Sequence, residues 1–130
     1  MRPGAQLQLA IFVGGVVGAL ARAGLAHAVV SDGRGWPWAT FAANVAGTCA
    51  LAYFATRLQE RLPPATFRRP LLGTGFCGAL TTFSTFQVEL IQLARNDRLG
   101  LAAGYLAASI GAGLVAMHVV SALTRRVRLR

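Results

Sequence analysis

The stretch GFCGALTTFSTF, residues 75–86, decides the fold, and it lies in a run without charge from Pro70 to Val88. A membrane helix built only of aliphatic residues would hold no such group of small and polar side chains. Non-helical backbone is tolerated at membrane depth only where protein buries it or where it lines a cavity. The stretch therefore predicts an interrupted membrane helix. Its notable residues are the glycines Gly73, Gly75 and Gly78, the hydroxyls Thr81, Thr82, Ser84 and Thr85, and the rings of Phe83 and Phe86.

The composition places this stretch in a membrane protein. The chain has 130 residues, of which 55% are hydrophobic and 13% charged, and its mean hydropathy is +0.53. A soluble domain carries roughly 25% charged residues, whereas a span needs about 20 mainly apolar residues. We predict a single all-α integral membrane domain, residues 1–130, with four transmembrane helices of which the third is broken near its middle. The predicted spans cover residues 5–30, 38–57, 70–94 and 99–123.

The net charge of +9 comes with arginine as the only basic residue type apart from two histidines. On a soluble protein it would suggest a nucleic-acid partner, but these arginines flank the apolar runs and are typical of residues that set membrane topology. If both termini lie on one side, nine arginines fall there and three on the other, which predicts cytoplasmic termini. The nine are Arg2, Arg57, Arg61, Arg68, Arg69, Arg125, Arg126, Arg128 and Arg130, and the three are Arg34, Arg95 and Arg98.

Three kinds of residue inside the runs invite a specific interpretation. Arg22 lies one turn beyond Gly18, and we interpret it as a snorkelling or carbonyl-capping residue rather than a ligand. Asn44 is strongly polar at depth, where an amide joins helices by hydrogen bonds or donates its NH₂ to an anion. Its position alone favours the joining role. Cys49 and Cys77 have no partner at ligand spacing, so we interpret them as small buried apolar residues.

The interrupted segment also suggests what kind of ion it would contact. A helix break frees carbonyl oxygens, which can coordinate a cation such as Na⁺. Phe83 and Phe86 share a helix face, and the edge of a phenyl ring is electropositive. Ring edges, an amide and hydroxyl donors together suit a small dehydrated anion. Two phenylalanines at helical spacing would, however, by themselves more often be packing or lipid-facing residues.

Beyond these arguments, GFCGALTTFSTF closely resembles the signature of the Fluc/CrcB fluoride channel family. Three other segments occur in the family's order and resemble its remaining motifs. GGVVGALAR resembles the Gly-rich first helix, TFAANVAG the second-helix motif with its Asn, and GYLAAS the Tyr-and-Ser stretch of the last helix. The resemblance covers the whole chain. It implies a fluoride-selective channel of the bacterial plasma membrane that lets fluoride leave the cell passively and so protects it from fluoride toxicity.

The resemblance also implies roles for individual residues. Phe83 and Phe86 would contact fluoride by their ring edges, and Asn44 would donate its amide to the ion. The remaining pathway residues would be Ser84 and Thr85 as a track of hydroxyls, with Tyr105 and Ser109 opposite, and Glu89 near the pore vestibule. Gly78 and Thr81 would offer backbone carbonyls to a structural Na⁺ at the centre of an antiparallel dimer with two pores.

Two features depart from the family pattern. Ala79 stands where the family usually has a second glycine, which narrows the backbone choices beside the Na⁺ site. The arginine bias favours one orientation, whereas an antiparallel homodimer requires both. We expect the antiparallel homodimer, with a heterodimer formed with an oppositely biased sister chain as the alternative.

Other functions fit the sequence less well. A small multidrug exporter is also short and four-spanning, but it needs a carboxylate within the membrane. The acidic residues here, Asp32, Glu60, Glu89 and Asp97, are predicted in loops or at the ends of spans. A non-conducting membrane subunit is compatible with the composition, yet packing alone does not need the set Asn44, Phe83 and Phe86. The sequence shows no arrangement typical of an enzyme.

Overall fold

The computed structural model describes residues 3–29, 32–61 and 67–127, with the backbone alone at residues 3 and 59–61. Every regular element in these ranges is helical. The elements are α1 (Pro3–Ala28), α2 (Trp38–Arg61), η1 (Pro70–Cys77), α3 (Gly78–Leu80), α4 (Phe83–Arg95) and α5 (Leu99–Arg126). The element η1 has the wider turns of a π-helix, in which the N–H of Gly78 reaches back to the carbonyl of Gly73.

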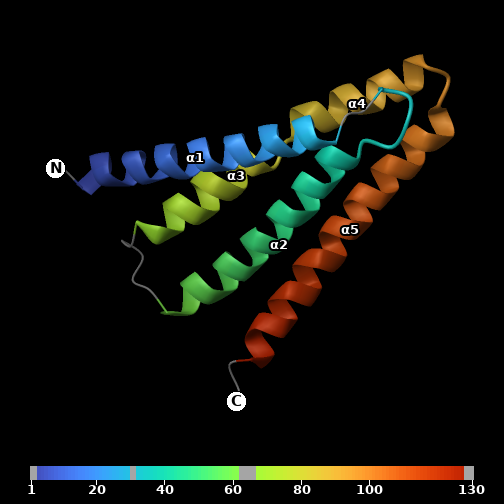
Figure 1. Ribbon diagram of the computed structural model, residues 1–130. Helices are drawn as coiled ribbons and strands as arrows, with labels where there is room; N and C mark the ends of the chain where they lie inside the picture. The colour runs from blue at the N-terminus through green and yellow to red at the C-terminus, as the bar shows by residue number, and fades with distance from the viewer. Residues whose placement is uncertain (1–2, 30–31, 62–66, 128–130) are drawn as a thin grey trace.

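The helices form two closely packed groups (Figure 1). The most extensive contacts join α1 to η1, and next α2 to α5. The two helices of each of these pairs run in the same direction, and α4 continues from α3 to the turn that leads into α5. The start of α2, the end of α4 and the start of α5 lie toward this end of the molecule, whereas α2 and α5 end far from the turn (Figure 1).

Glycines allow α1 and η1 to approach each other closely. A Cβ atom at Gly75 would lie 2.6 Å from the carbonyl oxygen of Ile11, closer than side chains pack. Added Cβ atoms at Gly14 and Gly18 would collide with the backbone oxygens of Leu71 and Phe76. These glycines therefore act through their lack of a side chain, the small-residue packing typical of membrane helices.

This contact corrects one expectation from the sequence. The sequence predicts that the glycines of residues 73–78, together with Thr81 and Thr82, form the interruption. Gly78 instead has helical dihedral angles, φ −63° and ψ −33°, and the only described glycine with positive φ is Gly33 in the loop after α1. The non-helical backbone begins at Thr81, after the glycines. Glycine is needed at position 75 because α1 leaves no room for a side chain there, not because the backbone needs conformational freedom.

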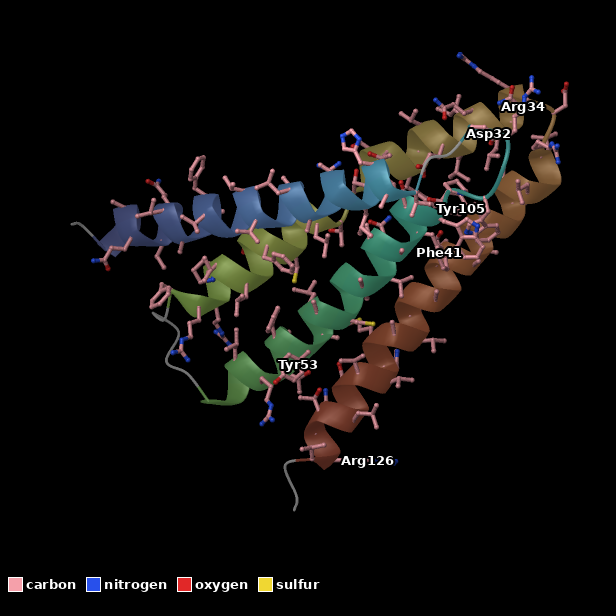
Figure 2. All side chains as sticks on the ribbon, viewed as in Figure 1. Asp32, Arg34, Phe41, Tyr53, Tyr105 and Arg126 are labelled. Atoms are coloured by element: carbon pink, nitrogen blue, oxygen red, sulfur yellow. The ribbon has the colours of Figure 1, made fainter. Side chains whose placement is uncertain are left out.

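The buried core lies where α4 and α5 converge. Tyr105 and Leu93 are fully buried there, together with Phe86 and Ala102. The ring of Trp36 packs edge-on against Tyr105, with centroids 5.4 Å apart. Figure 2 shows Tyr105 and Phe41 near this end of the molecule and Tyr53 and Arg126 toward the other. Of the two cysteines, which are both free thiols, Cys77 is buried and Cys49 half-buried.

The remaining apolar surface is extensive. Among the described helices, residues 4–28 and 99–126 are long and apolar enough, by length and composition, to cross a membrane. Both helices carry large apolar side chains that are exposed: Phe12 is 69% exposed, Leu20 67% and Val115 63%. Water would penalise so large an apolar surface, whereas lipid would not. This surface agrees with a membrane protein.

Candidate functional site

The centre of the molecule is the interruption between α3 and α4. Thr81 and Thr82 are both extended, with ψ of 152° and 120°, and α4 begins at Phe83. Threonine suits this position because its hydroxyl can replace a lost helical bond. The Oγ1 of Thr82 accepts the N–H of Thr85 at 3.2 Å and so caps α4.

The interruption releases backbone carbonyls. In a continuous helix the N–H of residue 82 would donate to the carbonyl of Gly78, and that of residue 85 to the carbonyl of Thr81. Both donors are used elsewhere, by Asn44 and by the Thr82 hydroxyl. The carbonyls of Gly78 and Thr81 thus lose their helical partners, and Gly78 is exposed. Two carbonyl oxygens at one helix end could serve as ligands for a hard cation.

Asn44 holds the interruption in place from α2. Its Oδ1 accepts the N–H of Thr82 at 2.8 Å, and its Nδ2 donates to the carbonyl of Thr82 at 3.2 Å. This pair of hydrogen bonds between the amide and an extended backbone joins α2 to the interrupted segment. It is the joining role that the position of Asn44 in the sequence favours. Because Nδ2 carries two hydrogens and Thr82 takes one, the other is left for a second acceptor.

Arg22 caps a third carbonyl of the same helix end. Its Nε donates to the carbonyl oxygen of Ala79 at 3.1 Å, and its side chain is half-buried. The prediction that Arg22 is a carbonyl-capping residue is confirmed. Arg22 neutralises part of the negative end of the α3 dipole at that point.

One cavity, which we call the ring cavity, gathers four of the predicted pathway residues. It measures about 360 Å³, and none of its lining residues carries a charge. Its walls are Asn44, Gly47, Thr48, Leu51, Thr81, Thr82, Phe83, Phe86, Ser109 and Ile110.

The two phenyl rings of this cavity differ in their surroundings. Phe83 is 71% exposed and Phe86 only 7%, with ring centroids 6.2 Å apart. Phe86 also packs against Tyr105, with centroids 5.0 Å apart. Phe86 is therefore a fixed part of the core, whereas Phe83 stands at the cavity's open side.

Ser109 is the unusual polar residue of the ring cavity. Its Oγ is buried, and no hydrogen-bond partner for it exists among the described residues. A buried hydroxyl without a partner costs free energy unless a ligand or water satisfies it. Ser109 thus keeps a hydroxyl donor that no described residue uses, at the wall of the ring cavity.

The other predicted pathway residues lie elsewhere. Ser84 is exposed, with its Oγ 3.3 Å from the Thr82 hydroxyl. Thr85 lines a different cavity. Tyr105 is fully buried, and its hydroxyl donates to Oε2 of Glu89 at 2.8 Å. Ser84, Thr85 and Tyr105 thus lie outside the walls of the ring cavity, although Ser84 and Thr85 both adjoin the Thr82 hydroxyl.

The second cavity, which we call the acid cavity, lies along α4 beside the loop after α1. It measures about 550 Å³ and is lined by Asp32, Gly33, Gly35, Pro37, Thr85, Val88, Glu89, Gln92, Leu93 and Asn96. The amide of Asn96 donates to the carbonyl of Gly33 at 3.2 Å and ties this loop to the turn after α4. The backbone N–H groups of Arg34 and Gly35 donate to Asp32, and these bonds hold the pKa of its carboxyl below the usual range.

Glu89 occupies a position that the sequence did not predict. We expected it at the end of a span, but it lies inside α4 and is half-buried. Thr40 donates to its Oε1 at 2.6 Å, and Tyr105 donates to its Oε2. Helices α2 and α5 thus each supply a hydroxyl that holds the carboxylate in place at the wall of the acid cavity.

Sequence reasoning missed two contributors to the site. Thr40 is buried and lies four residues before Asn44, on the same face of α2, so its spacing was an available signal. Gly47 faces the interruption, because an added Cβ would collide with the side chain of Thr81. Only the folded geometry reveals that contact. Among the described residues no group of three His, Cys, Asp or Glu side chains could hold a metal ion.

Comparisons with known proteins agree on one family. Residues 9–121 match the family described as "CrcB-like protein, Camphor Resistance (CrcB)". A protein named "Fluoride-specific ion channel FluC 1" from Mycolicibacterium paratuberculosis is 54% identical over 121 residues, which cover 93% of this chain and 92% of the relative. The protein of the same name from Mycobacterium tuberculosis is also 54% identical, with the same coverage. "Fluoride-specific ion channel FluC 2" from Geobacillus kaustophilus is 38% identical over 109 residues, 83% of this chain and 84% of the relative.

Proposed function

The chain belongs to the CrcB family, and from this premise we propose that it is a fluoride-specific ion channel of the cell membrane. It gives fluoride a passive way out of the cell and so protects against fluoride toxicity. The observation that carries the proposal is the uncharged ring cavity, in which Asn44, Phe83, Phe86 and the unpaired hydroxyl of Ser109 meet.

The chemistry of this cavity suits an anion. Ring edges are electropositive, and the free hydrogen of the Asn44 amide and the Ser109 hydroxyl are donors. No carboxylate lines the cavity to repel a negative ion. Each contact is weak, so fluoride can exchange its water stepwise and still leave, as conduction requires.

The remaining hydroxyls extend the pathway from this cavity. Ser84 and Thr85 surround the Thr82 hydroxyl at the start of α4, with Thr85 3.0 Å from it. Tyr105 acts through its bond to Glu89, which lies beside the acid cavity. We assign the acid cavity to the vestibule, where the ion is still hydrated and a nearby carboxylate is tolerated.

Gly78 and Thr81 would hold a structural Na⁺ through their released carbonyls. The fit is supported by the loss of their helical donors and by the exposure of Gly78. The ion would offset the negative end of α3, as Arg22 does at Ala79. Ala79 leaves the carbonyl ligands unchanged, because the backbone, not the side chain, supplies them.

The assembly that completes the pore is an antiparallel dimer in a four-span arrangement. The ring cavity opens at the surface of the single chain, since Phe83 is 71% exposed, and a second copy would close it. The partner is an identical chain or an oppositely biased sister chain. Labelling a tag at the carboxyl terminus from each side of the membrane distinguishes them, because an antiparallel homodimer requires labelling from both sides.

Flux from liposomes tests the function itself. Purified protein is reconstituted into liposomes loaded with potassium fluoride, valinomycin carries the counter-charge, and a fluoride electrode records efflux. We expect fast fluoride efflux and no chloride efflux under matched conditions. A correctly folded dimer without fluoride efflux would contradict the proposal and favour a non-conducting subunit.

A further inference from the structure

A third hollow lies at the arginine-rich end of the molecule, farther along α2 than the ring cavity. This arginine groove has a volume of about 600 Å³ and lies between the last turns of α2 and the start of η1. Arg57 and Arg68 line it, together with apolar side chains that include Phe54, Leu58, Phe67 and Leu71. It thus combines positive charge with an apolar wall.

The two arginines are positioned without an acidic partner among the described side chains. The guanidinium carbon of Arg57 lies 5.9 Å from the centroid of the Tyr53 ring, within range of a cation–π contact. The described acidic residues belong to the opposite end: Asp32 lies in the loop after α1, Glu89 inside α4 and Asp97 in the turn after α4. In the sequence between Thr56 and Phe86, four arginines accompany Glu60 alone. The groove therefore offers an excess of guanidinium donors.

The apolar wall narrows the class of ligand. Phe67 is 54% exposed and Tyr53 44%, so aromatic surface remains uncovered beside the two arginines. A free phosphate would pair with the guanidinium groups but leave this surface bare. A phospholipid satisfies both parts, because its phosphate forms paired hydrogen bonds with arginine and its acyl chain covers apolar surface.

We infer that the arginine groove binds an anionic phospholipid, with the phosphate at Arg57 and Arg68 and an acyl chain along Phe67 and Leu71. Anionic lipid headgroups attract basic residues beside a membrane span. This attraction acts in whichever leaflet the groove lies. The inference rests on the membrane placement of the chain and is independent of fluoride conduction.

Native mass spectrometry of the full-length protein, released from detergent micelles, tests the inference. Phosphatidylglycerol is titrated against phosphatidylcholine with the same acyl chains. We expect the wild-type protein to bind phosphatidylglycerol preferentially. Each arginine near a membrane surface contributes about 1 kcal/mol, or about fivefold in affinity. Arg57→Gln with Arg68→Gln should therefore weaken phosphatidylglycerol binding about thirtyfold, and Arg68→Gln alone, at an exposed site, about fivefold.

A matched control separates the groove from general charge. Arg95→Gln with Arg98→Gln removes the same charge at the other end, and it should leave the lipid preference unchanged. An equal fall in this control, or a wild-type protein that binds both lipids alike, would overturn the inference. Millimolar glycerol phosphate should not displace the lipid. Displacement by it would instead make the groove a phosphate site and overturn the lipid assignment.

Fluoride efflux keeps the two proposals distinguishable. The Arg57→Gln, Arg68→Gln variant should conduct like the wild type in phosphatidylcholine liposomes, because neither arginine lines the ring cavity. That result also shows that the variant is folded. If the variant does not fold, the Arg68→Gln protein supplies the same comparison, and an unchanged lipid preference in it would overturn the inference.

Discussion

The ring cavity and the acid cavity meet at α4 but differ in chemistry. Two adjacent residues, Thr85 and Phe86, belong to different cavities. The ring cavity has no charged wall and contains an unpaired hydroxyl, whereas the acid cavity has two carboxylates whose oxygens accept hydrogen bonds. One helix therefore separates an uncharged cavity from a cavity with carboxylates in its wall, and the proposed fluoride pathway depends on this contrast.

The largest expected effect follows from placing a charge in the ring cavity. Asn44→Asp keeps the size of the side chain but puts a carboxylate beside the fluoride pathway and removes the donor to Thr82. Two like charges about 4 Å apart repel by about 4 kcal/mol at an effective dielectric constant of 20. We expect at least a hundredfold loss of fluoride efflux, measured in liposomes.

The matching change in the acid cavity sharpens the contrast. Gln92→Glu adds a carboxylate to walls that already include Asp32 and Glu89. We expect less than about a threefold loss of efflux, because water in a vestibule screens the charge. Losses of equal size in the two variants would place the dehydrated step in the acid cavity instead.

The sequence predicted which residues form the site better than it predicted which of them lie in the same cavity. Motif resemblance and polar residues at depth identified Asn44, Phe83, Phe86 and Ser109, which do line one cavity. The same reasoning joined Tyr105 to this set, although its hydroxyl faces Glu89. Helical spacing shows which residues share a face, but not which neighbouring helix that face meets.

The ends of the helices also show what could and could not be predicted from the sequence. Apolar runs located the helices, and Arg22 was identified as a carbonyl cap from its position beside a small-residue face. The place where the backbone leaves the helix depends on Asn44, thirty-eight positions away from Thr82 in the sequence. A contact of such separation leaves no local pattern. For that reason the glycines seemed to mark the interruption, while their role is close packing.

A pair of hydroxyl deletions should separate conduction from stability. Ser109→Ala removes a hydroxyl without a partner, so stability should not fall, while fluoride efflux should decrease about threefold. Tyr105→Phe removes a bond to a carboxylate and should cost about 1.5–3 kcal/mol of stability. Thermal unfolding in detergent and liposome efflux measure the two effects. A stability loss in Ser109→Ala as large as that in Tyr105→Phe would contradict the assignment.

The smallest effect concerns the rim of the acid cavity. Two backbone N–H groups lower the pKa of Asp32 in the folded chain. The stability they contribute is therefore present above the ordinary carboxyl pKa of 3.8 and is lost as the pH falls through the lowered value. Asp32→Asn should flatten the acid limb of a stability–pH curve below about pH 4. An acid limb unchanged by the substitution would show that Asp32 does not contribute to it.

The central claim is that fluoride passes along the ring edges of Phe83 and Phe86. The most direct measurement compares fluoride efflux from liposomes containing Phe83→Ile, Phe86→Ile or, as a control outside the ring cavity, Phe41→Ile. Size-exclusion chromatography verifies that all three assemble. We predict at least a tenfold loss of efflux in the two ring-cavity variants and near wild-type efflux in the control. Wild-type efflux in both Phe83→Ile and Phe86→Ile would contradict the account.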